Sequence, residues 1–174
     1  MVANAPKVKL LSPSTMILWV PETGVLGGTA ASMTVAEMNA GVNVSCAVVT
    51  GYTLNATDSD TDDSKSICDN SNVENPTFDN YEANFSYFRD NGVNAVAVFV
   101  AAWNLFKRAG ARGYFVQRIG KGNSAAVAPG DYVSIFKVES DLPRSVDGTD
   151  DGSAVQFTVP YLPQGDMQIN RLMA

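Results

Sequence analysis

The feature that most constrains the fold of this chain is a two-residue alternation of apolar and polar side chains, repeated in short segments. Its clearest example is residues 80–87, where tyrosine, alanine, phenylalanine and tyrosine alternate with polar residues. Successive side chains of a strand point to opposite faces, so this pattern predicts a half-buried strand. Turn residues separate further candidate strands, at 16–20, 42–48, 114–119, 132–139, 154–159 and 167–173. The pattern predicts a mainly β fold, an antiparallel β-sandwich or partly open (split) barrel.

Two segments follow helical spacing instead. Residues 94–109 carry an apolar stripe with the i, i+3, i+4, i+7 spacing of one helix face: Val96, Phe99, Val100, Trp103 and Phe106. Asn94 is expected to cap the start of this flanking helix. A short helix is predicted at 34–40, because Thr34 and Glu37 have the spacing of a capping box.

Length and composition exclude several classes of protein. The 174 residues predict a single domain over 1–174, and a hydrophobic content of 45% excludes wholesale disorder. The chain contains no histidine. Serine–histidine and cysteine–histidine catalysis in their usual form are therefore excluded, as are histidine-ligated metal sites, and no cofactor is expected.

The two cysteines, Cys46 and Cys68, are too few for a thiolate zinc site. A disulfide could join them, but the N-terminal residues do not have the apolar core of a secretory signal. We therefore predict reduced thiols in a protein that folds inside the cell. The longest apolar runs, such as 95–103, are too short to span a bilayer, so no membrane contact is expected.

Residues 55–76 have no periodicity, and we predict a long assembly loop over about 51–76. Within it, four aspartates stand at positions 1, 3, 5 and 12 of a calcium-loop pattern: Asp58, Asp60, Asp62 and Asp69. The glycine required at position 6 is replaced by Asp63, and position 12 is not glutamate. A solvated acidic loop is the favoured interpretation, with a calcium site as the alternative.

Two further patterns have an ordinary and a functional interpretation. Residues 120–125 match G-x-G-x-x-A, but Pro129 follows too soon for the helix that a dinucleotide site needs, so a glycine turn is predicted. The chain is also rich enough in carboxylates for a glycosidase-like pair, although the sequence cannot show two of them facing each other.

Charge is unevenly distributed in a chain whose net charge is −6. Acidic residues concentrate between 58 and 90, whereas the stretch 91–130 contains only basic ones. A nucleic-acid patch, two ordinary solvated faces, and an acidic face that meets the basic face of another copy are the three interpretations. The third predicts the following subunit-interface residues: Asp58, Asp60, Asp62, Asp63, Lys107, Arg108, Arg112, Arg118 and Lys121.

Several segments, in order, resemble the major tail (tail tube) proteins of long-tailed phages of actinobacteria. They are Val20-Pro21, Thr34–Cys46, Ile67-Cys68-Asp69, Pro76–Ala83, Tyr87–Asp90, Gly113–Arg118 and Pro129–Phe136. Each segment is unspecific alone, and the order and spacing give the resemblance its weight. It covers nearly the whole chain and is weakest beyond Ser140.

The resemblance implies a non-enzymatic virion protein, assembled in the host cytoplasm, that forms stacked hexameric rings. The rings would make a tail tube that surrounds the tape-measure protein, meets a tail terminator, and conducts double-stranded DNA without binding it specifically. Side chains facing the channel are then expected to be acidic or neutral, with the cations of 107–121 elsewhere. The alternatives are a related sandwich subunit (tail terminator, neck or head-decoration protein) and a carboxylate-based hydrolase.

Overall fold

The computed structural model describes residues 14–62, 68, 74–89, 96–146 and 154–174. Its strands are β1 (Thr15–Pro21), β2 (Val42–Asn43), β3 (Thr53–Asp62), β4 (Asn75–Phe88), β5 (Arg112–Ile119), β6 (Tyr132–Ser140), β7 (Arg144–Val146) and β8 (Gln156–Leu172). The helices are α1 (Val35–Asn39) and α2 (Ala97–Phe106), with 3-10 turns η1 (Glu22–Gly24) and η2 (Ser45–Ala47). The fold is mainly β, as the sequence predicts.

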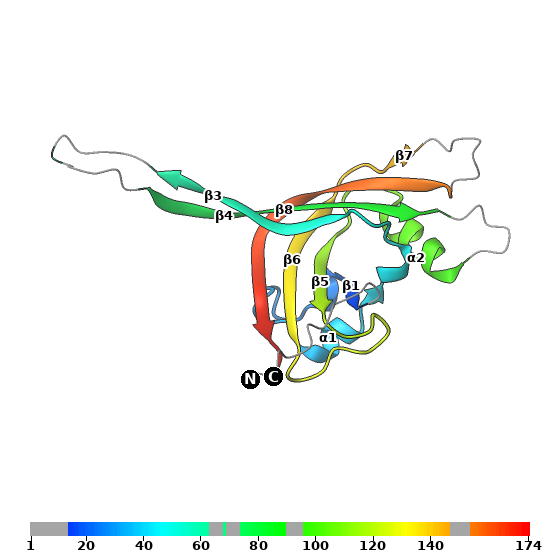
Figure 1. Ribbon diagram of the computed structural model, residues 1–174, viewed down its shortest axis with the longest axis horizontal. Helices are drawn as coiled ribbons and strands as arrows, with labels where there is room; N and C mark the ends of the chain where they lie inside the picture. Colours follow the sequence, from blue (N-terminus) through cyan, green and yellow to red (C-terminus); the bar gives the residue numbers. More distant parts are fainter. Residues whose placement is uncertain (1–13, 63–67, 69–73, 90–95, 147–153) are drawn as a thin grey trace, which may run out of the picture.

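All strands belong to one antiparallel sheet with the order β2-β1-β5-β6-β8-β4-β3, and β7 pairs with the first residues of β8. The sheet folds over itself because the long strand β8 bends (Figure 1). Its first part pairs with β4 and its second part with β6. Gly165 lies near the bend with a φ of 70°, a conformation that side chains disfavour. We call β7-β8-β4-β3 the first layer and β8-β6-β5-β1-β2 the second layer.

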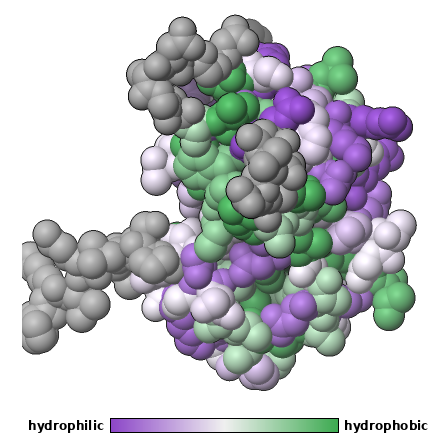
Figure 2. All heavy atoms as spheres, turned by 90° about the vertical axis from the view of Figure 1, so that its right-hand side faces the viewer, coloured by the Kyte–Doolittle hydropathy of each residue, from purple (hydrophilic) through white to green (hydrophobic). Residues whose placement is uncertain are grey.

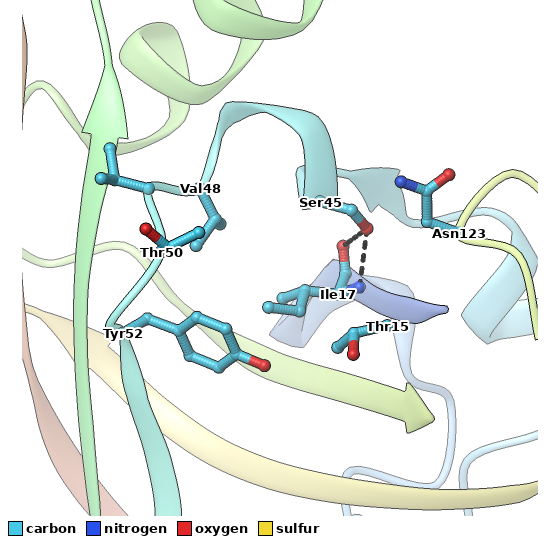
Figure 3. Close-up of a pocket in the computed structure, with 8 residues that line it drawn as sticks. Thr15, Ile17, Ser45, Val48, Thr50, Tyr52 and Asn123 are labelled. Carbon is cyan, nitrogen blue, oxygen red and sulfur yellow. Dashed lines mark hydrogen bonds between the residues drawn. The ribbon is translucent and has the colours of Figure 1, made fainter. Parts of the chain in front are cut away.

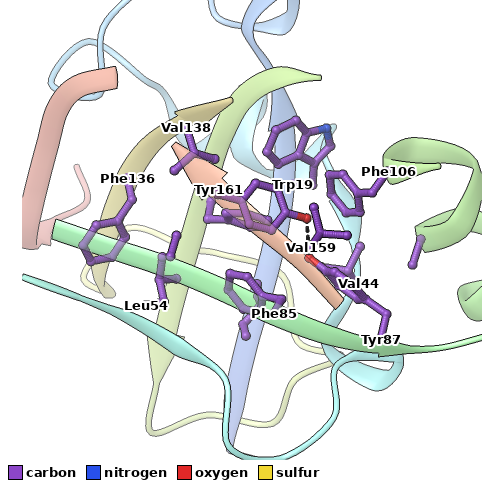
Figure 4. Packing of buried hydrophobic residues seen from close by; sticks show 14 of the residues in the cluster. Trp19, Val44, Leu54, Phe85, Tyr87, Phe106, Phe136, Val138, Val159 and Tyr161 are labelled. Carbon is purple, nitrogen blue, oxygen red and sulfur yellow. Dashed lines mark hydrogen bonds between the residues drawn. The ribbon is translucent and has the colours of Figure 1, made fainter. Parts of the chain in front are cut away.

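The main core lies between the two layers (Figure 4). The inward face of β4 supplies Tyr81, Ala83, Phe85 and Tyr87, which confirms the alternation predicted there. Trp19 of β1 contacts rings from α2 and β5, with centroids 5.0 Å from both Phe106 and Phe115. Because aromatic rings bury a large area each, this cluster supplies most of the apolar burial that joins the layers.

A second core lies on the opposite side of β1, β5 and β6. Met16, Leu18 and Val20 point into it, whereas Ile17 and Trp19 point into the main core. Both faces of β1 are therefore covered, which explains its continuous apolar run. The covering element is α1, whose Met38 is buried. Its start is the predicted capping box, with the Thr34 N–H donating to the Glu37 carboxylate at 2.7 Å.

Three predicted elements differ from the structure. The strand expected at 42–48 stops after Asn43 and turns into η2, so Cys46 is exposed rather than on a buried strand face. Strands expected at 154–159 and 167–173 are parts of the single strand β8. The helix expected at 94–109 is shorter and is capped at Val96 without a side-chain hydrogen bond. Asn94, the expected cap, lies outside the described residues.

Candidate assembly surfaces

The most prominent surface is a hairpin arm, formed by the parts of β3 and β4 that extend beyond the second layer (Figure 1). The prediction of a loop over about 51–76 is wrong for residues 53–62 and 75–76, which belong to the paired strands β3 and β4. Nearly all arm side chains are exposed, so neither face shows the apolar alternation that marks a half-buried strand. The expected assembly segment is therefore an ordered hairpin where the structure describes it.

Side chains stabilise the arm in place of a core. Thr77 donates from Oγ1 to the Asp60 carbonyl at 2.9 Å, and Asn80 donates from Nδ2 to the Asp58 carbonyl at 3.2 Å and to Asp60 Oδ1 at 3.1 Å. Phe78 is 71% exposed. A two-stranded hairpin alone is marginally stable in water, so the arm depends on these side-chain hydrogen bonds and on its continuity with the first layer. The sequence pattern did not single out Phe78.

Three aspartates of the calcium-loop pattern occupy a strand and not a loop. Asp58, Asp60 and Asp62 lie on β3, and Asp63 and Asp69 lie outside the described residues. In the described part of the chain, no three histidine, cysteine or carboxylate side chains gather at one point. A calcium loop must wrap its ligands around the ion, which an extended strand does not do.

The first layer has an outer face that no helix or strand of the described residues covers. Cross-strand pairs on this face are Thr53–Asn84, Asn55–Glu82 and Ser86–Thr158. The hydroxyls of Ser86 and Thr158 lie 2.7 Å apart. A groove of about 290 Å³ on this face is lined by nine residues, none of them charged: Val49, Thr50, Gly51, Tyr52, Thr53, Asn84, Ser86, Gln156 and Thr158. The groove is therefore polar and uncharged, and the face around it carries Glu82 opposite Asn55 and Arg144 opposite Thr158.

The third surface is an open groove of about 400 Å³ at the C-terminal end of α2, lined by Asn104, Leu105, Lys107, Arg108, Ala109, Gly110 and Ala111. Neither cation of the groove forms an ion pair within the described residues. Lys107 donates to Asn104 Oδ1 at 3.0 Å. Figure 2 faces the side of the molecule that carries α2, where hydrophobic and hydrophilic residues lie next to each other.

The cation cluster predicted over 107–121 is not one surface. Arg118 is 2% exposed, so its prediction as a contact with another subunit is wrong. Its guanidinium donates to Asp131 Oδ2 at 3.1 Å and to the carbonyls of Gly122, Ala125 and Ala126 at 2.8–2.9 Å. Arg118 therefore binds the carbonyl groups of the 120–131 loop from the interior of the protein. The glycine turn predicted at 120–125 is the first part of this loop.

The other cations also have different surroundings. Arg112 pairs with Glu139 at 2.8 Å on the surface, and Lys121 pairs with the buried carboxylate of Asp131. The Lys121 ammonium is the largest cause of a lowered pKa at Asp131; burial opposes it, and the Ala128 N–H and Arg118 lower it further. Lys107 and Arg108 are thus the members of the predicted cluster that form no ion pair within the described residues.

A small cavity of about 80 Å³ lies where β1 meets the segment after η2 (Figure 3). Ser45 closes one side of it and accepts the Ile17 N–H at 2.8 Å. Tyr52 lines the other side and accepts from Gln117 Nε2 at 2.9 Å. Cavities for small-molecule ligands measure roughly 300–1,000 Å³, so this one is too small. No aspartate or glutamate lines it or either groove described above.

The chain was compared with known families, curated proteins and solved structures. A family model described as "Phage tail tube protein" matches residues 2–174. No curated protein matches the sequence. One solved structure with a similar fold is a chain of the anti-feeding prophage baseplate, determined with six-fold symmetry, at 10% identity and a TM-score of 0.53 over 95% of each chain. At that identity the likeness shows the fold alone. In the described residues, no helix is long and apolar enough to cross a bilayer.

Proposed function

The chain belongs to the phage tail tube protein family, and from that premise we propose that it is the subunit that assembles into the wall of the tube. Membership makes it a structural component of the virion. The proposal adds hexameric rings, the stacking of rings, assembly in the host cytoplasm and the passage of DNA. The single observation that supports it best is the first layer, which has an uncovered face and two free edges.

The edges of the first layer give a way to close a ring. Within the described residues, β3 and β7 each pair on one side only. The layer contains four antiparallel strands, so β3 of one copy and β7 of the next run antiparallel when copies are related by rotation. Pairing of these edges adds strand to strand around a closed barrel and removes the exposed edges that favour aggregation.

The uncovered face of the first layer then faces the channel. The second layer cannot supply this face, because α1 and its neighbours cover the outer side of β1, β5 and β6. DNA carries one negative charge per roughly 1.7 Å of its axis, so cations on the wall would hold it. Asn84, Ser86 and Thr158 offer DNA no cation, and Lys107 and Arg108 lie off this face. Arg144, opposite Thr158 on the edge strand β7, is the exception.

The same assembly defines the partners. The tape-measure protein would occupy the channel before DNA does, and a tail terminator would cover the last ring. A related virion subunit, such as a terminator, neck or head-decoration protein, would form one closed ring without stacking. The proposed work requires no cofactor and no catalysis, and none of the cavities described above brings two carboxylates together for a hydrolase.

The test is electron microscopy of the purified full chain, combined with hydrogen exchange before and after assembly. We expect stacked rings or tubes, and slower amide exchange at β3 and β7 once they form. Monomers at high concentration would overturn the proposal, and single rings that never stack would favour the terminator or neck alternative. Tubes in which β3 and β7 exchange as fast as in the monomer would overturn the edge pairing alone.

A further inference from the structure

We propose that Phe78 on the arm of one copy inserts into the groove at the C-terminal end of α2 of a neighbouring copy. The inference rests on the proposed tube function and identifies a contact that fixes one copy against another. The occupant is a second copy of this chain, and the contact surfaces are the arm face around Phe78 and the groove with Lys107 and Arg108 on its rim.

The arm presents an aromatic ring beside a positioned carboxylate. Asp60 and Phe78 are paired across β3 and β4, and Asn80 lies two residues further on the same face. Asn80 donates to Asp60 Oδ1 at 3.1 Å, which holds that carboxylate near the exposed ring. An aromatic anchor with a charge next to it is a common centre of protein interfaces.

The groove provides the complementary surface. Leu105, Ala109 and Ala111 give it apolar walls, and Lys107 and Arg108 contribute two cations. Its volume is about 400 Å³. Engineered cavities of roughly 150 Å³ take up benzene, so the groove has room for a phenyl ring. Gly110, with a φ of 90°, lies in the segment after α2 and leaves the groove without a side chain at that point.

Charge favours this pairing over other contacts. The described part of the arm carries six acidic residues and no cation: Asp58, Asp60, Asp62, Glu74, Asp79 and Glu82. Two arms therefore repel each other, as do two grooves, whereas an arm and a groove attract. Such complementarity fixes the register of an interface and suppresses wrong contacts more than it adds affinity.

The arm cannot reach the groove of its own copy. The arm and α2 project from opposite sides of the molecule (Figure 1). The contact therefore joins different surfaces of two copies. A head-to-tail contact of this kind repeats from copy to copy, as required in an assembly of many identical subunits.

Disulfide trapping tests the contact directly. In a Cys46→Ser, Cys68→Ser background, the Phe78→Cys, Ala109→Cys variant is assembled, oxidised and run on a denaturing gel. We expect a ladder of covalent oligomers that a reducing agent collapses, since a disulfide needs Cα atoms within about 7 Å. The matched control is Phe78→Cys, Thr158→Cys, whose second cysteine lies on the uncovered face of the first layer. It should give no ladder.

The outcomes separate the two proposals. If the background protein forms no tubes or rings, the tube function fails. If it forms tubes and the Phe78–Ala109 variant assembles without a ladder, or the control gives an equal ladder, the arm–groove contact is wrong and the function stands.

A charge reversal keeps the inference testable if the cysteine variant does not assemble. The double variant Lys107→Glu, Arg108→Glu should raise the concentration needed for assembly at least tenfold. The measurement is made at 0.15 M salt, at which exposed charges more than about 8 Å apart are largely screened from each other. Adding Asp58→Lys, Asp60→Lys should restore assembly, and the control Ser124→Glu, in the exposed 120–131 loop, should leave it unchanged. Normal assembly of the reversed variant would overturn the contact, as would a failure of the compensating changes to restore it.

Discussion

The phenolic oxygens of Tyr87 and Tyr161 lie 2.8 Å apart in the centre of the core, one from each of two neighbouring strands. Both rings are buried, and burial raises the pKa of each hydroxyl well above its usual value. The pair therefore stays neutral at every pH at which the protein works. Each hydroxyl is the hydrogen-bond partner of the other, because the surrounding side chains are aromatic.

Removal of one of these hydroxyls should cost more than removal of both. Tyr87→Phe leaves the Tyr161 hydroxyl buried without its partner, and such a group costs about 1–3 kcal/mol. Replacement of both tyrosines by phenylalanine should recover most of that loss, since no polar group then remains unpaired. Urea unfolding of the two single variants and the double variant measures this. Additive losses in the double variant would contradict the expectation.

The free energy of unfolding should decrease in acid as Asp131 becomes protonated. Its pKa is lowered, chiefly by Lys121, so the folded state holds this carboxyl ionised at a pH where the unfolded chain binds a proton. The contribution is complete above the unfolded pKa of about 3.9 and disappears as the pH falls through the lowered folded pKa. Urea midpoints between pH 6 and 2.5 should show this loss. The Asp131→Asn variant should be less stable than the wild type at pH 6. Its free energy of unfolding should decrease less than that of the wild type on acidification.

Two glycines, one in close contact with its neighbours and one in open space, allow a matched test of packing. A Cβ at Gly113 would lie 2.5 Å from the Val20 carbonyl oxygen and 2.7 Å from the Trp19 ring, whereas a Cβ at Gly122 meets nothing within 4 Å. Gly113→Ala should therefore cost about 1–3 kcal/mol by forcing β5 away from β1. Gly122→Ala should change the free energy of unfolding by less than about 0.5 kcal/mol. Thermal unfolding compares the two, and equal effects would refute the close approach.

Cations on the uncovered face of the first layer should make the tube retain DNA. Ser86→Arg, Thr158→Arg should assemble normally, because both side chains point away from the core. Assembled variant tubes should bind double-stranded DNA in a filter assay at low salt and release it as salt rises, whereas wild-type tubes should not bind. Ser124→Arg in the exposed 120–131 loop is the control. Binding by the control as strong as that by the variant would place the channel elsewhere.

The helices and strands that bury only one of their faces could be predicted from the sequence. The alternation at Tyr81–Tyr87, the capping box at Thr34 and the mainly β fold are confirmed. The failures have a common physical cause. The arm is exposed on both faces, so β3 carries no apolar signal even though its backbone is paired with β4. Likewise η2 buries Val44 and Ala47 through a turn, which no alternation could indicate.

The candidate surfaces were harder to predict, because a sequence does not show whether a charged side chain points to the surface or into the protein. Lys107 and Arg118 are both cations of one acid-free stretch, yet Lys107 lies at an open groove and Arg118 is buried in contact with Asp131. Only the fold separates them. Phe78 stands in a polar segment, and only its pairing with Asp60 shows that it belongs to an exposed arm.

Strand β8 has a mechanical consequence. It is a single covalent segment of 17 residues that belongs to both layers: residues 156–161 pair with β4, and residues 161–172 pair with β6. In the proposed tube, force applied to the first layer therefore passes along the polypeptide backbone into the second layer. The two layers cannot slide past each other unless β8 loses its hydrogen bonds to β4 or β6. Each subunit therefore transmits load as one rigid body.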